Sequence, residues 1–167
     1  TMRMDVDLAA DNFSPVNLEQ NGPIPVHGTL ATDIRGRVSG PLDSIFADVN
    51  VTVLPSTDIT YPIDDKNMAQ VKPYGTVNIQ YNTAVGELDL GGKLNVDDGI
   101  VRYSPKLYPM MPFRVDSGSH VTFNGPLGNT DLRLSASQQV KADVQSAGQE
   151  PRRVAFNTGV RVNGILD

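Results

Sequence analysis

The 167-residue chain contains no cysteine and no tryptophan, and it has only two histidines. Without cysteine, disulfides, thiolate nucleophiles and zinc sites with cysteine ligands are excluded. His27 and His120 are isolated and fall on the polar positions of expected strands, which predicts solvated surface histidines rather than metal ligands. We therefore expect no metal and no cofactor.

The chain is also poor in clustered positive charge and in long apolar runs. It carries 14 Lys+Arg against 19 Asp+Glu, a net charge of −5, and its basic residues cluster only at Arg152 and Arg153. Nucleic-acid binding needs a basic patch, so no nucleic-acid partner is expected. No run approaches the ~18 apolar residues of a membrane-spanning helix, and the segment from Thr1 lacks the apolar core of an export signal. If this is a cell-envelope protein, we expect the chain to be a piece of a longer one.

Signals for catalysis are weak. The carboxylate pairs Asp64-Asp65 and Asp97-Asp98 fall in expected turns, where aspartate caps its own backbone, and this explains them better than an acid/base pair does. A nucleophile elbow and a phosphate-binding loop are both missing. The chain is not expected to be an enzyme.

Apolar and polar residues alternate along most of the chain, which is typical of strands with one buried and one wet face. The pattern begins with Met2, Met4, Val6 and Leu8 and predicts about ten strands, and no convincing helical spacing appears. The alternation breaks at turn signals that include Asp97-Asp98-Gly99. Residues 137–153 are polar and are expected to form a loop with at most a short strand over 140–144.

Glycines fall on the apolar positions of several of these strands, where they relieve crowding in a sheet that bends strongly. A closed barrel, a sandwich and a sheet curled into an open groove all satisfy this pattern. The glycines concerned are Gly28, Gly36, Gly40, Gly92 and Gly125.

The order of motifs in the second half narrows the choice. Phe113, Val115 and Gly118 precede Phe123 and Gly125, and a short loop then leads to the alternating residues 131–136. A final V-x-V-x-G strand runs from Val160 to Gly164. This order resembles the C-terminal region of the TamB family, the periplasmic translocation and assembly module proteins of the AsmA-like, bridge-like lipid-transfer superfamily. The resemblance covers residues 49–167 well and residues 1–48 only in style.

The resemblance implies an all-β fold: one elongated, strongly curved sheet shaped like a taco or half-pipe, with an apolar concave groove. Residues 1–167 would form a single groove domain of a longer protein in the periplasm of a Gram-negative bacterium, anchored in the inner membrane by a segment outside this chain. The groove would carry phospholipid acyl chains between the inner and outer membranes and support outer-membrane biogenesis, and the full-length protein would meet a BamA-type barrel partner. The residues expected to line the groove are Leu88, Leu90, Leu94, Val96, Phe113, Val115, Val121, Phe123, Leu132, Leu134, Val160 and Val162.

Two other functions stay open. The chain could be a chaperone or assembly factor that handles outer-membrane β-barrel strands through its sheet edges. It could also be a structural or adhesin-like sandwich, in which the same apolar residues form a sealed core. Exposed sheet edges invite pairing, so the isolated chain is expected to self-associate through them.

Overall fold

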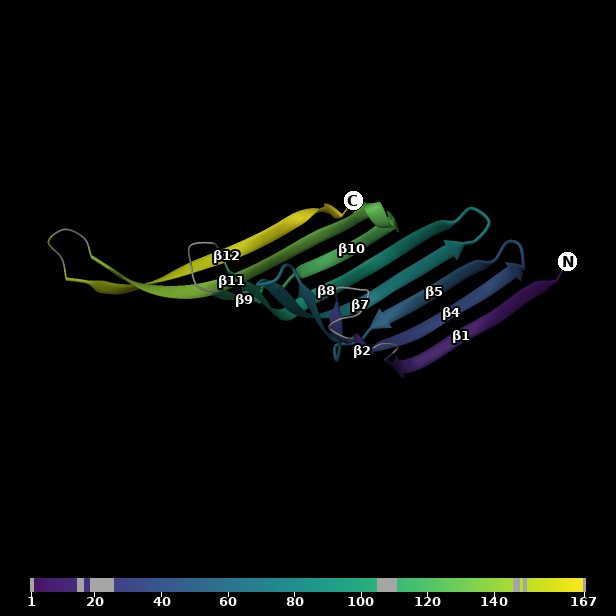
Figure 1. The fold of residues 1–167 in the computed structure, drawn as a ribbon, viewed down its shortest axis with the longest axis horizontal. Helices are drawn as coiled ribbons and strands as arrows, with labels where there is room; N and C mark the ends of the chain where they lie inside the picture. The colour runs from purple at the N-terminus through teal and green to yellow at the C-terminus, as the bar shows by residue number, and fades with distance from the viewer. Residues whose placement is uncertain are drawn as a thin grey trace.

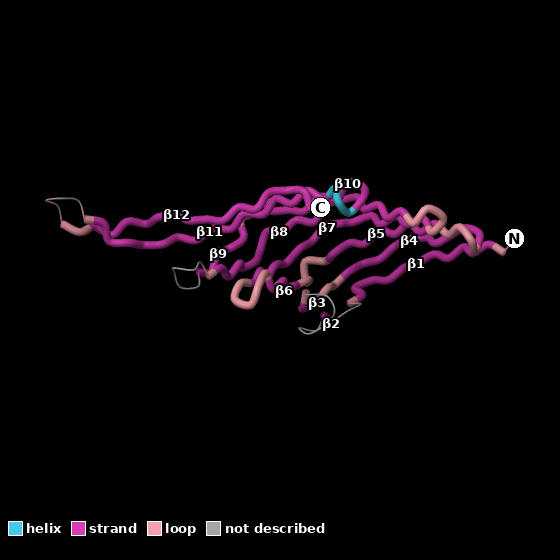
Figure 2. Tube along the Cα trace, turned by 45° about the horizontal axis from the view of Figure 1, so that its top comes forward, coloured by secondary structure: helices cyan, strands magenta, loops and turns pink. Residues whose placement is uncertain are grey.

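The computed structural model describes residues 2–14, 17–18, 26–104, 111–145, 148 and 150–166. These residues form one antiparallel sheet of 12 strands without an α-helix, and their only helical turn is the 3₁₀ segment η1 (Leu127–Asn129) (Figures 1 and 2). The all-β prediction is confirmed. The number of strands exceeds the expected ten because several strand positions across the sheet, here called rows, are each occupied by two strands that follow one another with a break between them.

The strands are β1 (Arg3–Phe13), β2 (Asn17–Leu18), β3 (His27–Thr29), β4 (Thr32–Pro41), β5 (Phe46–Val53), β6 (Asp58–Pro62), β7 (Met68–Asn82), β8 (Glu87–Tyr103), β9 (Met111–Val115), β10 (Ser119–Pro126), β11 (Thr130–Val144) and β12 (Arg152–Leu166).

The sheet is an up-and-down meander in which each row pairs with the next along the chain. Its spatial order is β1-β4-β5-β7-β8-β10-β11-β12. The short strands β2, β3, β6 and β9 continue the rows of β1, β4, β5 and β10, since β3 pairs with β2 and β6, β6 with β7, and β9 with β8 and β11. β1 and β12 lie at opposite margins (Figure 1).

Side-chain hydroxyls bridge neighbouring rows where the rows are interrupted. Thr57, which is fully buried, accepts a hydrogen bond from the Ala31 amide at 3.0 Å and donates one to the Ala31 carbonyl at 3.1 Å. The Thr32 hydroxyl donates to the Phe13 carbonyl at 3.1 Å, and the Ser119 hydroxyl accepts from the Ser135 amide at 3.1 Å. The Thr57 and Ser119 hydroxyls thereby accept hydrogen bonds from the Ala31 and Ser135 amides beside the interruptions.

Two sequence predictions of local structure are wrong. Asp97-Asp98-Gly99 is not a turn, because β8 continues through it. Between the pairs Val71–Gly99 and Pro73–Val96, β8 has one residue more than β7, and this extra residue forms a β-bulge. The loop predicted over residues 137–153 is too long: the strand allowed over 140–144 is present but already includes residues 137–139, and β12 begins at Arg152. Residues 137–144 are the second half of β11 and pair in unbroken register with β12, because ladder hydrogen bonds do not depend on side-chain polarity.

The sheet has no second layer among the described residues. In the described part of the chain only six hydrophobic residues are buried, while 17 large hydrophobic residues are exposed. The accessible surface is 11270 Å², against about 8,000 Å² for a compact monomer of this mass. Most apolar side chains are therefore covered only by their neighbours in the same sheet. The buried hydrophobic residues are Ala31, Val53, Val77, Val96, Phe113 and Ala136.

Two glycines on adjacent central strands have a backbone conformation that other residues rarely adopt. Gly75 has φ +141° and Gly92 has φ +116°, and a Cβ at either position would lie 2.2 Å from a backbone oxygen of the neighbouring strand. The close approach of β7 and β8 therefore requires glycine at both positions. Gly92 belongs to the glycine set noted in the sequence, whereas Gly75 was missed.

Adjacent glycines in β8 provide a matched test. We expect Gly92→Ala to lower the free energy of unfolding by about 2 kcal/mol or more, because the substitution combines an unfavourable φ with a clash against the Thr76 carbonyl oxygen. Gly91→Ala should leave stability unchanged or raise it by about 0.5 kcal/mol, because a Cβ there meets no atom within 4 Å. Urea denaturation of both variants measures the difference. Equal effects would contradict the role assigned to Gly92.

Candidate functional site: the apolar face and its cavity

The strand register places one set of alternating residues on a single side of the sheet, here called the apolar face. One line across it joins Val6, Val38, Ala47, Tyr81 and Leu88 through direct cross-strand pairs. A second line continues from Leu94 through Val121 to Leu132. Paired residues of antiparallel strands share a face, so the apolar face runs from β1 to β12.

All 12 residues predicted to line a groove lie on the apolar face, but their exposure differs. Val96 and Phe113 are each only 4% exposed and form part of the small core. Leu88, Val160 and Val162 are exposed, with Val162 at 49%. The others, Leu90, Leu94, Val115, Val121, Phe123, Leu132 and Leu134, are half-buried.

A cavity of about 290 Å³ opens on the apolar face. Its lining contains no Asp, Glu, Lys, Arg or His, and its walls come from β6, β7, β8, β9, β11 and β12 together with Ile63, which follows β6. Five predicted residues line it: Val115, Leu132, Leu134, Val160 and Val162. The residues that were not predicted for this site are Tyr61, Ile63, Ala69, Val71, Val101, Ser135 and Ala136.

Most of the missed lining residues carry the same alternating signal as the predicted ones. Tyr61 and Ile63 belong to an apolar alternation in the sequence, and Tyr61 pairs with Ala69, which in turn pairs with Val101. What the sequence lacks is any sign that β6 and β12 border one cavity although several rows of the sheet separate them. Distance across a sheet depends on its three-dimensional path, which local periodicity does not encode.

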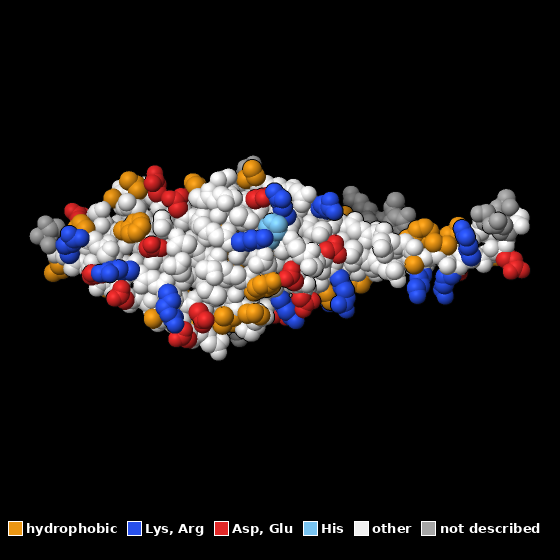
Figure 3. Space-filling model, turned by 180° about the vertical axis from the view of Figure 1, so that it is seen from behind, with side chains coloured by type: hydrophobic (Ala, Val, Ile, Leu, Met, Phe, Trp, Pro, Cys, Tyr) orange, Lys and Arg blue, Asp and Glu red, His pale blue; other side chains and the backbone are white. Residues whose placement is uncertain are grey.

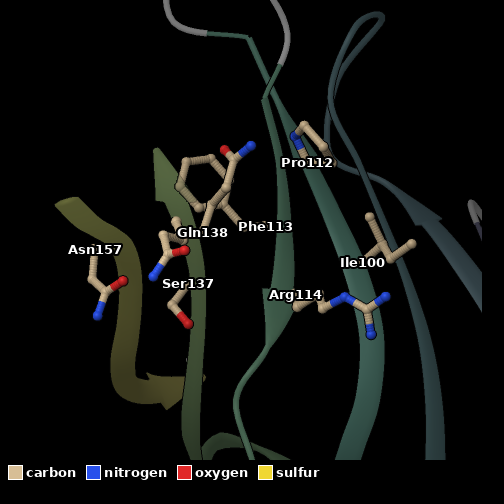
Figure 4. Close-up of a pocket in the computed structure, with 8 residues that line it drawn as sticks. Ile100, Pro112, Phe113, Arg114, Ser137, Gln138 and Asn157 are labelled. Atoms are coloured by element: carbon tan, nitrogen blue, oxygen red, sulfur yellow. The ribbon is translucent and has the colours of Figure 1, made fainter. Parts of the chain in front are cut away.

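A second, more polar cavity of about 580 Å³ lies where β9 and β11 separate. Their last paired residues are Arg114 and Ser137, and beyond them Phe113 and Gln138 both line the space (Figure 4). The Gln138 Oε1 atom is buried and has no hydrogen-bond partner among the described residues. Phe113 therefore borders this gap rather than the apolar cavity.

The opposite face of the sheet carries ion pairs. Arg37 binds Asp5 at 2.5 Å, and Lys72 lies 3.1 Å from Asp98. The Arg37 guanidinium holds the pKa of Asp5 below its usual range. Figure 3 shows basic and acidic side chains spread along the molecule on this side. His27 and His120 pair with Thr60 and Arg133, so they lie on this face, as predicted.

The predicted carboxylate pairs serve the backbone. Asp64 accepts hydrogen bonds from the amides of Lys66 and Asn67, each at 2.8 Å, which lowers the pKa of Asp64 and confirms the predicted turn there. Asp97 sits in the β8 bulge, where it accepts from the Tyr74 hydroxyl and, at 3.1 Å, from the Gly118 amide. No cluster of His, Asp or Glu suited to a metal ion occurs in the described parts of the chain.

Comparison with known proteins gives no match to a family model, to a curated protein or to a solved structure. Within the ranges given above, the structure contains no helix with the length and apolar character needed to cross a membrane. The arguments about function therefore depend on the apolar face, its cavity and the sheet edges.

The bulge at Asp97 leads to a pH prediction. The Tyr74 hydroxyl and then the Gly118 amide lower the pKa of Asp97, so its ionised form stabilises the folded state. This contribution is present above the unfolded-state pKa of about 3.9 and is lost as the pH falls through the lower folded value. We expect Asp97→Asn to be less stable than wild type at pH 7, with a difference that narrows below pH ~4, as measured by urea denaturation.

Tyr74→Phe is the matched variant, because it removes the hydroxyl donor and keeps the carboxylate. It should show the same direction of change. A stability difference for Asp97→Asn that stays constant from pH 7 to pH 2.5 would contradict this account.

Proposed function

We propose that this chain is a lipid-binding groove domain that holds phospholipid acyl chains against its apolar face. The observation that carries the proposal is the combination of an apolar face running across the sheet, its lack of a covering layer among the described residues, and a cavity on it without a charged lining residue. Acyl chains need a continuous dry surface and no specific polar recognition. Each CH₂ group removed from water contributes about 0.8 kcal/mol.

The groove itself, a sheet curled lengthwise into a half-pipe, is part of this proposal. Two observations support it. The apolar cavity has walls from β6 and from β12, which are not neighbouring rows. Glycines with positive φ also recur on the apolar side of the strands, at Gly28, Gly40, Gly75, Gly92 and Gly125, where they permit close approach and bending.

The cellular setting is proposed on the resemblance to the TamB family. In that setting the domain lies in the periplasm and forms part of a longer, inner-membrane-anchored protein that moves phospholipid between the two membranes. A BamA-type barrel would be its outer-membrane partner. Lipid transfer by this route is non-covalent, and we propose no catalytic step.

A second candidate function is the handling of outer-membrane β-barrel strands. The observation that favours it is that β1 and β12 each have only one neighbour among the described strands, which leaves backbone donors and acceptors along two long edges. An extended segment could add to such an edge by main-chain hydrogen bonds. Crosslinks from β1 or β12 to an unfolded barrel protein, without bound lipid, would favour this function.

Tyr61 provides a direct test of lipid binding. It lines the apolar cavity and is 47% exposed, so the fold should tolerate a substitution there. Tyr61→Arg places a charge beside the acyl chains and should reduce co-purified phospholipid at least tenfold, because an unpaired charge in an apolar site is costly. Native mass spectrometry with organic extraction measures the bound lipid.

Thr60→Arg is the control, because Thr60 pairs with Gln70 and His27 on the opposite face of the same strand. This variant should retain the lipid content of wild type. Circular dichroism should show equal strand content in all three proteins. Absence of lipid from the wild type, with no uptake from added phospholipid vesicles, would overturn the proposed function.

A further inference from the structure

The two outer strands of the sheet are long and opposite in charge, and each has a single neighbour among the described strands. β1 carries three aspartates and one arginine, whereas β12 carries three arginines and no acidic residue. A β1–β1 pairing centred on Asp7, or a β12–β12 pairing centred on Arg161, would oppose like charges, which is destabilising across strands. Pairing β1 of one copy with β12 of another allows Arg161 to face an aspartate, whereas Arg153 is already paired with Asp143 within the chain.

Strand direction fits the same arrangement. The meander has eight rows that alternate in direction, so β12 runs opposite to β1. A second copy placed beside the first, with the same orientation and its β1 next to β12, continues the sheet as another antiparallel pair. The apolar faces of the two copies then lie on the same side, as the side-chain alternation requires.

One register of β1 against β12 pairs apolar residues on one face of the junction and opposite charges on the other. On the apolar face it places Val6 opposite Val162 and Leu8 opposite Val160, four side chains that are exposed in the single chain. On the other face it places Asp7 opposite Arg161. Asp7 lies opposite Arg37 within its own chain but forms no ion pair with it, and Arg161 forms none among the described residues, whereas Asp5 and Asp11 are already paired with Arg37 and Arg35. Shifting the register by two residues separates Asp7 from Arg161.

We propose that copies of this chain associate head to tail, with β1 of one copy pairing antiparallel with β12 of the next and Asp7 lying opposite Arg161. The junction buries exposed apolar side chains and pairs two open backbone edges. Each added copy presents a new β12 or β1 edge, so the contact does not close and produces a series of oligomers. The apolar face becomes continuous across copies. The proposal depends on the edges and stands or falls independently of lipid binding.

Cysteine crosslinking tests the register directly, because the native chain contains no cysteine. Copies carrying only Val6→Cys are mixed with copies carrying only Val162→Cys under mild oxidation. Directly opposite residues have Cα atoms about 4.5–5.5 Å apart, within disulfide reach. We expect a disulfide-linked heterodimer in the mixture and at least tenfold less crosslinking in either variant alone.

The control mixture pairs Ala10→Cys with Val162→Cys, which the register places four residues out of line and therefore about 13 Å apart along the strand. It should crosslink at least tenfold less than the first mixture. Equal crosslinking in both mixtures, or crosslinking within a single variant, would overturn the proposed junction. So would a strictly monomeric wild type in sedimentation velocity at high concentration.

Charge exchange provides a second test without cysteine. Asp7→Arg and Arg161→Asp should each weaken association at least tenfold, because each variant opposes like charges at the junction. An equimolar mixture of the two should recover the oligomer series of the wild type, since the exchanged charges face each other. Weak association of the mixture, with both variants folded, would contradict the assigned register. Lipid extraction on the same samples separates this outcome from failure of the proposed function.

Discussion

The antiparallel hydrogen-bond ladder is the interaction on which the rest of this molecule depends. With six buried hydrophobic residues and no second layer in the described part of the chain, the protein has little of the packed interior that stabilises most domains of its length. Cross-strand pairs and backbone bonds must therefore supply an unusually large share of its stability. This explains why the chain places hydroxyls such as that of Thr57 wherever a row is interrupted, since a single-layer sheet can leave few backbone groups unpaired.

The same constraint links the fold to the proposed function. An apolar face that is not sealed by its own protein exposes side chains to water at a cost in free energy. Phospholipid along the face would reduce that exposed area, and pairing of copies at β1 and β12 would reduce it only at the edges. The ion pairs on the opposite face, such as Lys72 with Asp98, are solvent-exposed and contribute little stability, but they keep that side polar.

Much of the fold could be predicted from the sequence, because period-two alternation is strong in nearly every row. The prediction failed where tertiary pairing overrides local signals. At Asp97-Asp98-Gly99 a bulge inserts one residue and shifts the alternation, so that Val96 and Val101 share a face although their numbers differ in parity. A turn produces the same break in the sequence. For residues 137–139, polar composition indicated a loop, but pairing with β12 extends the strand expected over 140–144 through them.

For the site, the alternation correctly predicted that all 12 residues share one face of the sheet, but it could not rank them by exposure. Val96 is buried by its neighbours and Val162 is open, yet both have the same sequence pattern. Tyr61 lines the cavity only because β6 and β12 lie close enough in space to border it together. The local sequence pattern gives no information about the distance between two strands that are not neighbours in the sheet.

The separation of β11 from β9 beyond Ser137 has a consequence for how the molecule opens. Past this point β12 is the only partner of β11 among the described strands, so residues 138–144 and their partners in β12 form a two-stranded ribbon that projects from the sheet (Figure 1). Isolated two-stranded ribbons are marginally stable in water. We therefore expect the ribbon to open separately from the rest of the sheet, and its amide protons to exchange with solvent well before those of the central strands β7 and β8.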